Sequence, residues 1–91
     1  MINETSIIQR NDGIVETEID GELVMMSIEN GAYYGLDSIA KRIWQLIETP
    51  SSVESICNKV LQEYEVEKSQ CLHELLEFLN AMAKQNVIKL N

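Results

Sequence analysis

Apolar residues recur through residues 14 to 36, above all in the run Glu22-Leu-Val-Met-Met-Ser-Ile28, which is typical of antiparallel β-strands. Asp20-Gly21 and Asn30-Gly31 interrupt the pattern, and both pairs are typical of two-residue type I′ turns, whose central residues need positive φ. They predict a meander of three strands, the last of which covers residues 32 to 36. Alternation is weaker before this region, so we expect residues 1–12 to be an N-terminal tail that can contribute one short strand.

The two turns also predict the register and the two faces of this sheet. Counting outward pairs Val15 with Met26, Ile28 with Tyr33, and Met26 with Gly35. One face then collects most of the apolar side chains, and we expect it to pack on the helices. Its members are Val15, Thr17, Ile19, Val24, Met26, Ile28 and Tyr33. The opposite, outward-facing side carries Glu16, Glu18, Ser27 and Tyr34.

After the third strand the apolar spacing changes to that of helices. Asp37 predicts the N-cap of a first helix, which runs to about residue 48 and places Trp44 on its inner face. A second helix is expected to start at Ser51, because Ser51 and Glu54 have the spacing of a capping box.

A third helix is predicted from residue 67 to 85, followed by a left-handed residue at Asn86 and a short extended tail. Its apolar residues cover an arc of about 160°, wider than packing on one neighbour requires. The members of this arc are Cys71, Leu72, Leu75, Leu76, Phe78, Leu79, Met82 and Ala83. Two interpretations remain open: either other elements sandwich the helix, or Cys71, Phe78 and Met82 line a groove.

The chain has 91 residues, which predicts one small domain over residues 13–91. A net charge of −8 weighs against nucleic acid, because affinity for phosphate backbones comes mainly from Lys and Arg. The sequence has neither an apolar run of about 20 residues nor a secretory signal at its start, so we expect a cytoplasmic protein without a membrane partner. In that compartment Cys57 and Cys71 are expected to be half-buried, reduced thiols rather than a disulfide.

Few residues in the chain could carry catalysis. His73 is the only histidine, and it falls on the polar side of the third helix. Cys57 and Cys71 lie on different predicted helices with no second His or Cys pair near them, which supports neither a zinc site nor a redox motif. We therefore expect neither an enzyme nor a cofactor or metal site.

The strand over residues 32 to 36 is the outermost of the meander, so one edge of its backbone is open. Such an edge can accept an extended peptide as an additional strand, and the wide apolar arc of the third helix would offer pockets for its side chains. We therefore predict a peptide-binding site. Its candidate residues are Ala32, Tyr33, Tyr34, Gly35, Cys71, Glu74, Leu75, Phe78, Leu79 and Met82.

The order and spacing of several short motifs resemble a known family over residues 14 to 90. These motifs are Gly31-Ala-Tyr-Tyr-Gly-Leu-Asp37, Ala40-x-x-Ile43-Trp44, Ser52-Val53-x-x-Ile56, Phe78-Leu79 and Val87-Ile88. The chain resembles the PqqD-like proteins, the RiPP recognition elements that bind the leader peptides of ribosomally made precursors. Asp37 stands where the family usually has Asn, and either residue can cap the helix.

The resemblance implies an α+β, winged-helix-like domain, with a three-stranded antiparallel meander followed by three helices. The Tyr-Tyr-Gly-Leu and Ile-Trp variant is most similar to the stand-alone leader-binding proteins of lasso-peptide biosynthesis, an antibiotic pathway. It implies a non-catalytic adaptor that binds the leader by strand addition at residues 32–36, beside the third helix. The adaptor would deliver the precursor to a leader peptidase and a macrolactam-forming cyclase.

Two alternatives remain open. A PqqD-like protein can also serve as a peptide chaperone for a radical enzyme that acts on another type of precursor. A winged-helix fold can also bind DNA, which requires a basic recognition helix. The third helix offers only Lys68 and Lys84 against several glutamates, which argues against DNA binding.

Overall fold

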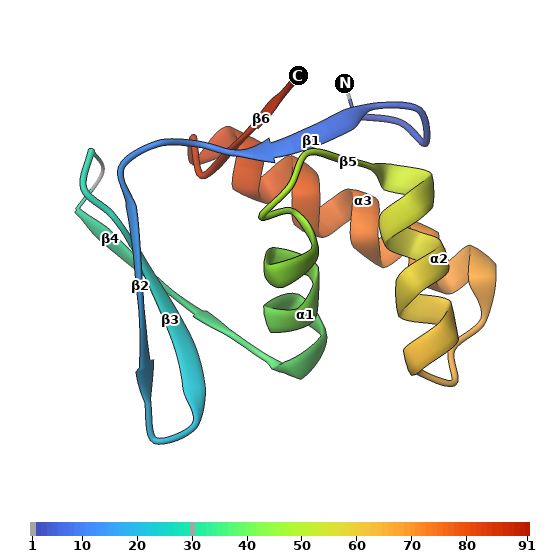
Figure 1. The fold of residues 1–91 in the computed structure, drawn as a ribbon, viewed down its shortest axis with the longest axis horizontal. Helices are drawn as coiled ribbons and strands as arrows, with labels where there is room; N and C mark the ends of the chain where they lie inside the picture. The colour runs from blue at the N-terminus through green and yellow to red at the C-terminus, as the bar shows by residue number, and fades with distance from the viewer. Residues whose placement is uncertain (1, 30) are drawn as a thin grey trace.

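The computed structural model of the chain describes residues 2–29 and 31–91. Two small antiparallel sheets and three helices make up this part of the chain (Figure 1). The elements in chain order are β1 (Ile7–Arg10), β2 (Ile14–Ile19), β3 (Glu22–Ser27), β4 (Ala32–Leu36), α1 (Ser38–Leu46), β5 (Ser51–Ser52), α2 (Val53–Glu63), α3 (Lys68–Lys84) and β6 (Ile88–Leu90). The predicted α+β class, a meander followed by three helices, is confirmed. No helix among the described residues is long and apolar enough to cross a membrane.

The first hairpin has the predicted register. Val15 lies opposite Met26, and the last pair before the turn is Ile19 with Glu22. The connection consists of Asp20-Gly21, with φ values of 54° and 82°. Both lie in the left-handed region that a type I′ turn requires, so the local sequence alone determines this turn.

The second hairpin differs from the prediction. Its last pair is Ser27 with Ala32, so that four residues connect β3 to β4 instead of two. Met26 therefore faces Tyr33, and the predicted pairs of Met26 with Gly35 and of Ile28 with Tyr33 are wrong. The predicted turn residue Asn30 lies outside the described residues.

Packing on the helix side accounts for the observed register. A shift of two residues keeps every side chain on its own face, so the alternation of the sequence cannot tell the two registers apart. The observed one places Leu36 opposite Leu23 and Tyr34 opposite Met25. Large side chains of both strands thus meet on one side, where Leu23, Met25 and Leu36 are buried.

The face that packs on the helices is also the opposite of the predicted one. Val15, Ile19 and Tyr33 are exposed, at 47%, 55% and 74% of their surface. The predicted outward-facing carboxylates instead lie on the helix side. Trp44 Nε1 donates to Glu16 Oε2 at 2.6 Å, and Lys41 Nζ lies 3.0 Å from Glu18 Oε1.

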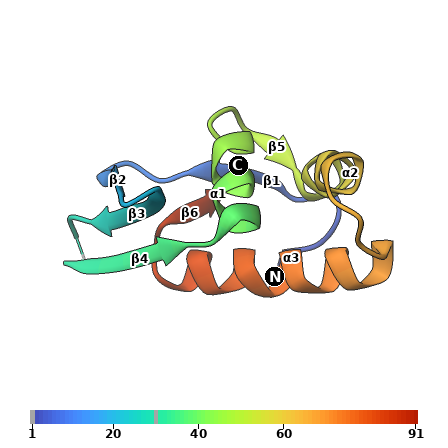
Figure 2. The same cartoon turned by 90° about the horizontal axis from the view of Figure 1, so that it is seen from below.

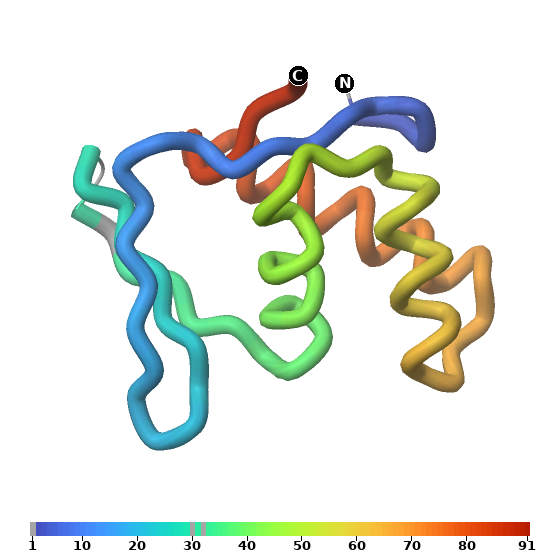
Figure 3. The backbone as a smooth tube through the Cα atoms, in the orientation of Figure 1, coloured from blue at the N-terminus to red at the C-terminus, as the bar shows by residue number. Residues whose placement is uncertain are grey.

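The N-terminal segment forms the central strand of the second sheet, whose order is β5-β1-β6. Ile8 lies opposite Ser51 on one side and Leu90 on the other, and its side chain is completely buried. Figure 3 shows the first and last parts of the backbone side by side. The short strand that the sequence allowed in the tail therefore joins the two ends of the chain and contributes to the shared core.

The first helix starts and the third helix ends as expected, whereas the first helix ends at Leu46, about two residues before the predicted end. The side chain of Asp37 caps α1 by accepting from Ala40 N at 2.8 Å, and Trp44 in this helix is buried. After α3 the chain turns at Asn86, whose φ of 60° is the predicted left-handed conformation. Figure 2 shows α3 along one side of the molecule, with α1 and α2 both on the same side of it.

The capping residue of α2 differs from the prediction by one position. Ser52 Oγ accepts from Ser55 N at 3.1 Å, whereas Ser51 Oγ donates to the carbonyl oxygen of Thr49 at 2.9 Å. The backbone N–H of Glu54 donates to Glu4 O, so it forms no capping box with Ser51. Pairing of β5 with β1 places Ser51 in a strand, and the helix therefore begins one residue later.

Ser52→Ala is expected to lower the free energy of unfolding by about 1 kcal/mol, because it leaves one N–H at the start of α2 without its acceptor. Urea denaturation measures this change. Ser55→Ala is the matched control: Ser55 is exposed in the same turn, and its capped N–H belongs to the backbone. Equal loss of stability in both variants would show that the Ser52 hydroxyl does not act as a cap.

Candidate functional site

β4 is an edge strand. In the order β2-β3-β4 it pairs only with β3 among the strands that the structure describes. One row of its backbone N–H and C=O groups therefore points away from the sheet, where water or another chain can bond to it.

The register of β3 shows which of its residues bond to β2 and which bond to β4. Ile19 and Glu22 flank a two-residue turn, so they form a hydrogen-bonded pair. Successive residues of a central antiparallel strand bond alternately to either side, so the even-numbered residues of β3 bond to β2 and the odd-numbered ones to β4. The bond from Ile28 N to Gly13 O at 3.1 Å continues the even-numbered series.

The same alternation identifies the backbone groups of β4 that face outward. Tyr34 lies opposite the odd-numbered Met25, so its backbone groups point toward β3. Tyr33 and Gly35 alternate with it, so their N–H and C=O groups lie on the open edge. An ideal Cβ at Gly35 would meet no atom within 4 Å, so the outer face of the sheet, toward which this position points, is open there.

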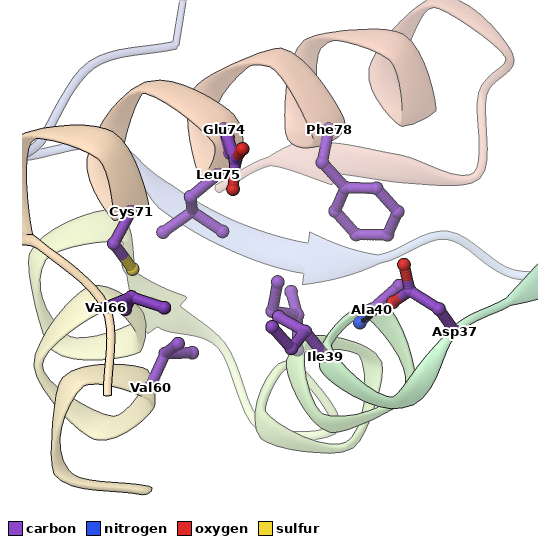
Figure 4. A pocket seen from close by; sticks show the side chains of 10 residues that line it. Asp37, Ile39, Ala40, Val60, Val66, Cys71, Glu74, Leu75 and Phe78 are labelled. Atoms are coloured by element: carbon purple, nitrogen blue, oxygen red, sulfur yellow. Dashed lines mark hydrogen bonds between the residues drawn. The ribbon is translucent and has the colours of Figure 1, made fainter. Parts of the chain in front are cut away.

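A pocket of about 320 Å³ lies between the three helices, close to the end of β4 (Figure 4). Its lining residues are Asp37, Ile39, Ala40, Ile43, Val60, Val66, Cys71, Glu74, Leu75 and Phe78. In Figure 4 the Phe78 ring points from α3 toward Ala40 and Asp37 at the start of α1. Because Asp37 directly follows β4, the open strand edge and the pocket are neighbours along the chain.

Eight of the ten lining side chains are apolar, and the other two, Asp37 and Glu74, are carboxylates. One oxygen of Asp37 accepts from Ala40 N. A pocket of this composition favours an apolar or aromatic side chain, and its carboxylates favour a hydrogen-bond donor or a cation next to it.

The predicted residues of α3 divide between the pocket and the core. Cys71, Glu74, Leu75 and Phe78 line the pocket. Leu79 is completely buried and Met82 is 7% exposed, and neither contributes to the lining. The part of the apolar arc nearest to α1 and α2 therefore borders this pocket.

The predicted residues of β4 contribute in different ways. Ala32 pairs with Ser27 at the start of the strand. The Tyr33 side chain projects from the outer face of the sheet, whereas the Tyr34 hydroxyl on the helix side donates to Gln85 Oε1 at 3.3 Å. Gly35 is exposed and leaves its neighbourhood open.

The sequence analysis missed the pocket residues that do not belong to α3. Ile39 and Ile43 belong to α1 and Val60 to α2, and their helical spacing indicates only that each helix has an apolar side. Val66 lies in the short connection between α2 and α3 and is 38% exposed. No periodicity distinguishes an apolar side chain that fills a core from one that lines a cavity, so this part of the site appears only in three dimensions.

Two thiols meet beside the pocket. Cys57 of α2 and Cys71 of α3 are both free and buried, deeper than expected, and their sulfur atoms are 3.8 Å apart. Burial, with a smaller contribution from the Cys57 thiol, raises the pKa of Cys71 to about 11. The thiolate is the reactive form, so Cys71 is a poor nucleophile at neutral pH.

Cys71 is expected to resist alkylation by iodoacetamide at pH 8 in the folded protein. With its pKa at about 11, roughly one thiol in 1,000 is ionised at that pH. Mass spectrometry of peptides after timed labelling measures the rate, and the same reaction in urea supplies the control in which the thiol is exposed. Labelling of Cys71 at equal rates with and without urea would contradict its burial.

His73 lies apart from the pocket. Its Nε2 is 2.9 Å from Glu77 Oε1, and both side chains are largely exposed, at 73% and 69%. Within residues 2–29 and 31–91, no group of three or more His, Cys, Asp or Glu residues is arranged to hold a metal ion.

Comparison with known proteins gives one family and two similar structures. The family model described as coenzyme PQQ synthesis protein D (PqqD) matches residues 22–88. TbiB1 in complex with the TbiA(beta) leader peptide is 32% identical, with a TM-score of 0.81 over 89% of this chain and 94% of that chain. A lasso peptide synthetase B1 complexed with the leader peptide is 18% identical, with a TM-score of 0.79 over 90% and 96% of the two chains, and shows the fold alone.

No curated protein matches the chain significantly. The family model nevertheless spans well over half of the 91 residues and includes β3, β4, all three helices and the pocket. The chain therefore belongs to the PqqD family.

Proposed function

We propose that this protein is a non-catalytic adaptor that binds the leader peptide of a ribosomally made precursor in lasso-peptide biosynthesis. It presents the precursor to a leader peptidase and a macrolactam-forming cyclase. The open edge of β4 beside an apolar pocket carries this proposal. The similarity to TbiB1, a leader-peptide complex at 32% identity, supports it.

In the proposed complex the leader lies along β4 as a fourth, antiparallel strand. Its backbone bonds to the N–H and C=O groups of Tyr33 and Gly35, which supply affinity without regard to side chains. An antiparallel partner has its N-terminal end next to Leu36, where β4 ends and the pocket begins. A large apolar side chain just before the paired residues therefore fills the pocket and supplies selectivity.

The charge of the protein favours a basic leader. The net charge is −8, and Asp37 and Glu74 add carboxylates at the pocket itself. Lys or Arg in the leader would speed association through attraction at long range, while apolar contacts in the pocket would govern dissociation.

Gly35→Pro is expected to weaken leader binding at least about tenfold, because proline removes the outward N–H and places its ring on the open edge. Fluorescence anisotropy with a labelled synthetic leader from the precursor encoded beside this protein measures the affinity, and circular dichroism checks the fold. The matched control is Glu18→Pro on β2, the other edge of the same sheet. There too the substituted N–H faces away from β3, because the odd-numbered residues of β2 bond to that strand.

Normal affinity in Gly35→Pro, together with weak binding in Glu18→Pro, would place the leader on β2 and overturn the proposed site. Hydrogen exchange gives an independent view of the same question. On addition of the leader, amides in β4 and α3 are expected to gain protection before those in β2.

One alternative function is a peptide chaperone that serves a radical enzyme. It is consistent with the name of the matched family, coenzyme PQQ synthesis protein D. The same edge and pocket would then bind a different precursor. Titration with both kinds of leader separates the two functions, and the lasso assignment requires tighter binding of the lasso leader.

A further inference from the structure

The outer face of the β2-β3-β4 sheet is apolar and open. We define it by the side chains that point away from the helices. Its apolar members are Val15, Ile19, Val24, Met26 and Tyr33, together with Ile28 in the adjoining turn, and its polar members are Thr17 and Glu22. Ile28 is 64% exposed. Val15, Met26 and Tyr33 lie opposite one another on the three strands, so their side chains are neighbours across the sheet. Contiguous apolar surface of this kind marks an interaction site.

This sheet forms one end of the molecule, with the helices on its other side (Figures 1 and 2). Leu23, Met25 and Leu36 on that helix side already supply the sheet's share of the core. The apolar residues of the outer face are therefore not part of this core, and their exposed surface is available to a partner.

The charge around the outer face indicates the kind of partner. Residues 13 to 36 contain no Lys, Arg or His, and their acidic residues are Glu16, Glu18, Asp20, Glu22 and Glu29. Asp20, Glu22 and Glu29 are exposed at the ends of the strands. A second copy, also with a charge of −8, would bring like charges together around the apolar contact. A partner with an apolar patch surrounded by Lys and Arg is complementary.

The direction of the bound leader indicates which protein would dock on the outer face. A leader antiparallel to β4 has its C-terminal end at the start of β4, beside Tyr33 of the outer face. The peptide bond that joins leader and core lies beyond that end, so the protease that cuts it must work there. A cyclase acts on the core after cleavage and has no need to contact this end.

We infer that the outer face docks the leader peptidase, through an apolar patch of the peptidase that is surrounded by basic residues. This inference rests on the proposed function and adds the surface that brings the peptidase to the bound leader. Leader and peptidase then occupy different surfaces of the same sheet: the open edge of β4 and the outer face.

The test uses the double variant Val15→Glu/Ile19→Glu, which places two charges on β2, the strand farthest from the leader. The matched control is Asn58→Glu/Gln62→Glu, which adds the same charge at two exposed positions of α2. Leader affinity is measured by anisotropy, and affinity for the purified peptidase encoded beside this protein by calorimetry. We expect the test variant to bind the leader within twofold of the original protein and the peptidase at least tenfold more weakly. The control variant is expected to keep both affinities.

Unchanged peptidase affinity in the test variant, or no binding of the peptidase to the original protein, overturns the inference. So does an original protein that sediments as a dimer and becomes monomeric in the test variant, because a second copy then covers the outer face. Failure of the original protein to bind the leader overturns the proposed function instead. If the double variant does not fold, Ile28→Glu in the turn replaces it under the same criteria.

Discussion

Trp44→Ala is expected to lower the free energy of unfolding by about 3–5 kcal/mol, which is a large share of the roughly 5–15 kcal/mol of an ordinary domain. The indole is 1% exposed, and its Nε1 donates to Glu16 Oε2 at 2.6 Å. The Arg10 guanidinium lies 4.2 Å from the centre of the indole ring, and its Nε donates to Trp44 O at 3.1 Å. Trp44 thus joins α1 to β1 and to β2, which belong to different sheets.

Urea denaturation of Trp44→Ala and Trp44→Phe separates packing from hydrogen bonding. The Phe variant keeps an aromatic ring in the core but removes the N–H, so we expect it to lose less stability than the Ala variant. A melting temperature of Trp44→Ala equal to that of the original protein would contradict the packing described. Glu16→Ala is no neutral control, because Glu16 accepts from Trp44 and lies 3.8 Å from Arg10.

Phe78→Ala is expected to weaken leader binding by about 2 kcal/mol, or roughly 30-fold, because a small number of central anchors dominates most interfaces. Phe78 is only partly buried by the protein's own core, and its ring lies at the pocket near the end of β4. Part of its surface is therefore available to a ligand. Anisotropy with the labelled leader measures the loss.

Leu76→Ala is the matched control for Phe78→Ala. Leu76 is also partly buried on α3 but does not line this pocket, so its truncation is expected to change stability more than affinity. Leu75→Asp would not serve, since Leu75 is 2% exposed and a buried charge would unfold the domain. Equal affinity of folded Phe78→Ala and the original protein would exclude the pocket as the anchor site.

The sequence by itself determined the features that depend on neighbouring residues. Asp20-Gly21 specified a two-residue turn because few other pairs adopt positive φ at both positions. Asp37 specified the start of α1, since its side chain reaches an N–H only three residues ahead. The open edge of β4 also followed from chain order, because a last strand in a meander has one neighbour.

Only the tertiary structure decided which face of the meander is buried. Both faces carry large apolar side chains, and the face predicted to be buried was the one that collects most of them. Glu16 and Glu18 occupy the helix side because Trp44 and Lys41 provide partners for them, and those residues are more than 20 positions away along the chain. A polar side chain can lie against a core when a distant residue satisfies it, and no local pattern contains that information.

The cap of α2 and the pocket depended on distant segments in the same way. Ser51 has the local pattern of an N-cap, but its pairing with Ile8 takes it into a strand, so Ser52 caps the helix instead. The pocket takes side chains from three helices, whose periodicities predict only that each has an apolar side. Which of those side chains fill the core and which border open space depends on how closely the helices approach, and packing in three dimensions determines that distance.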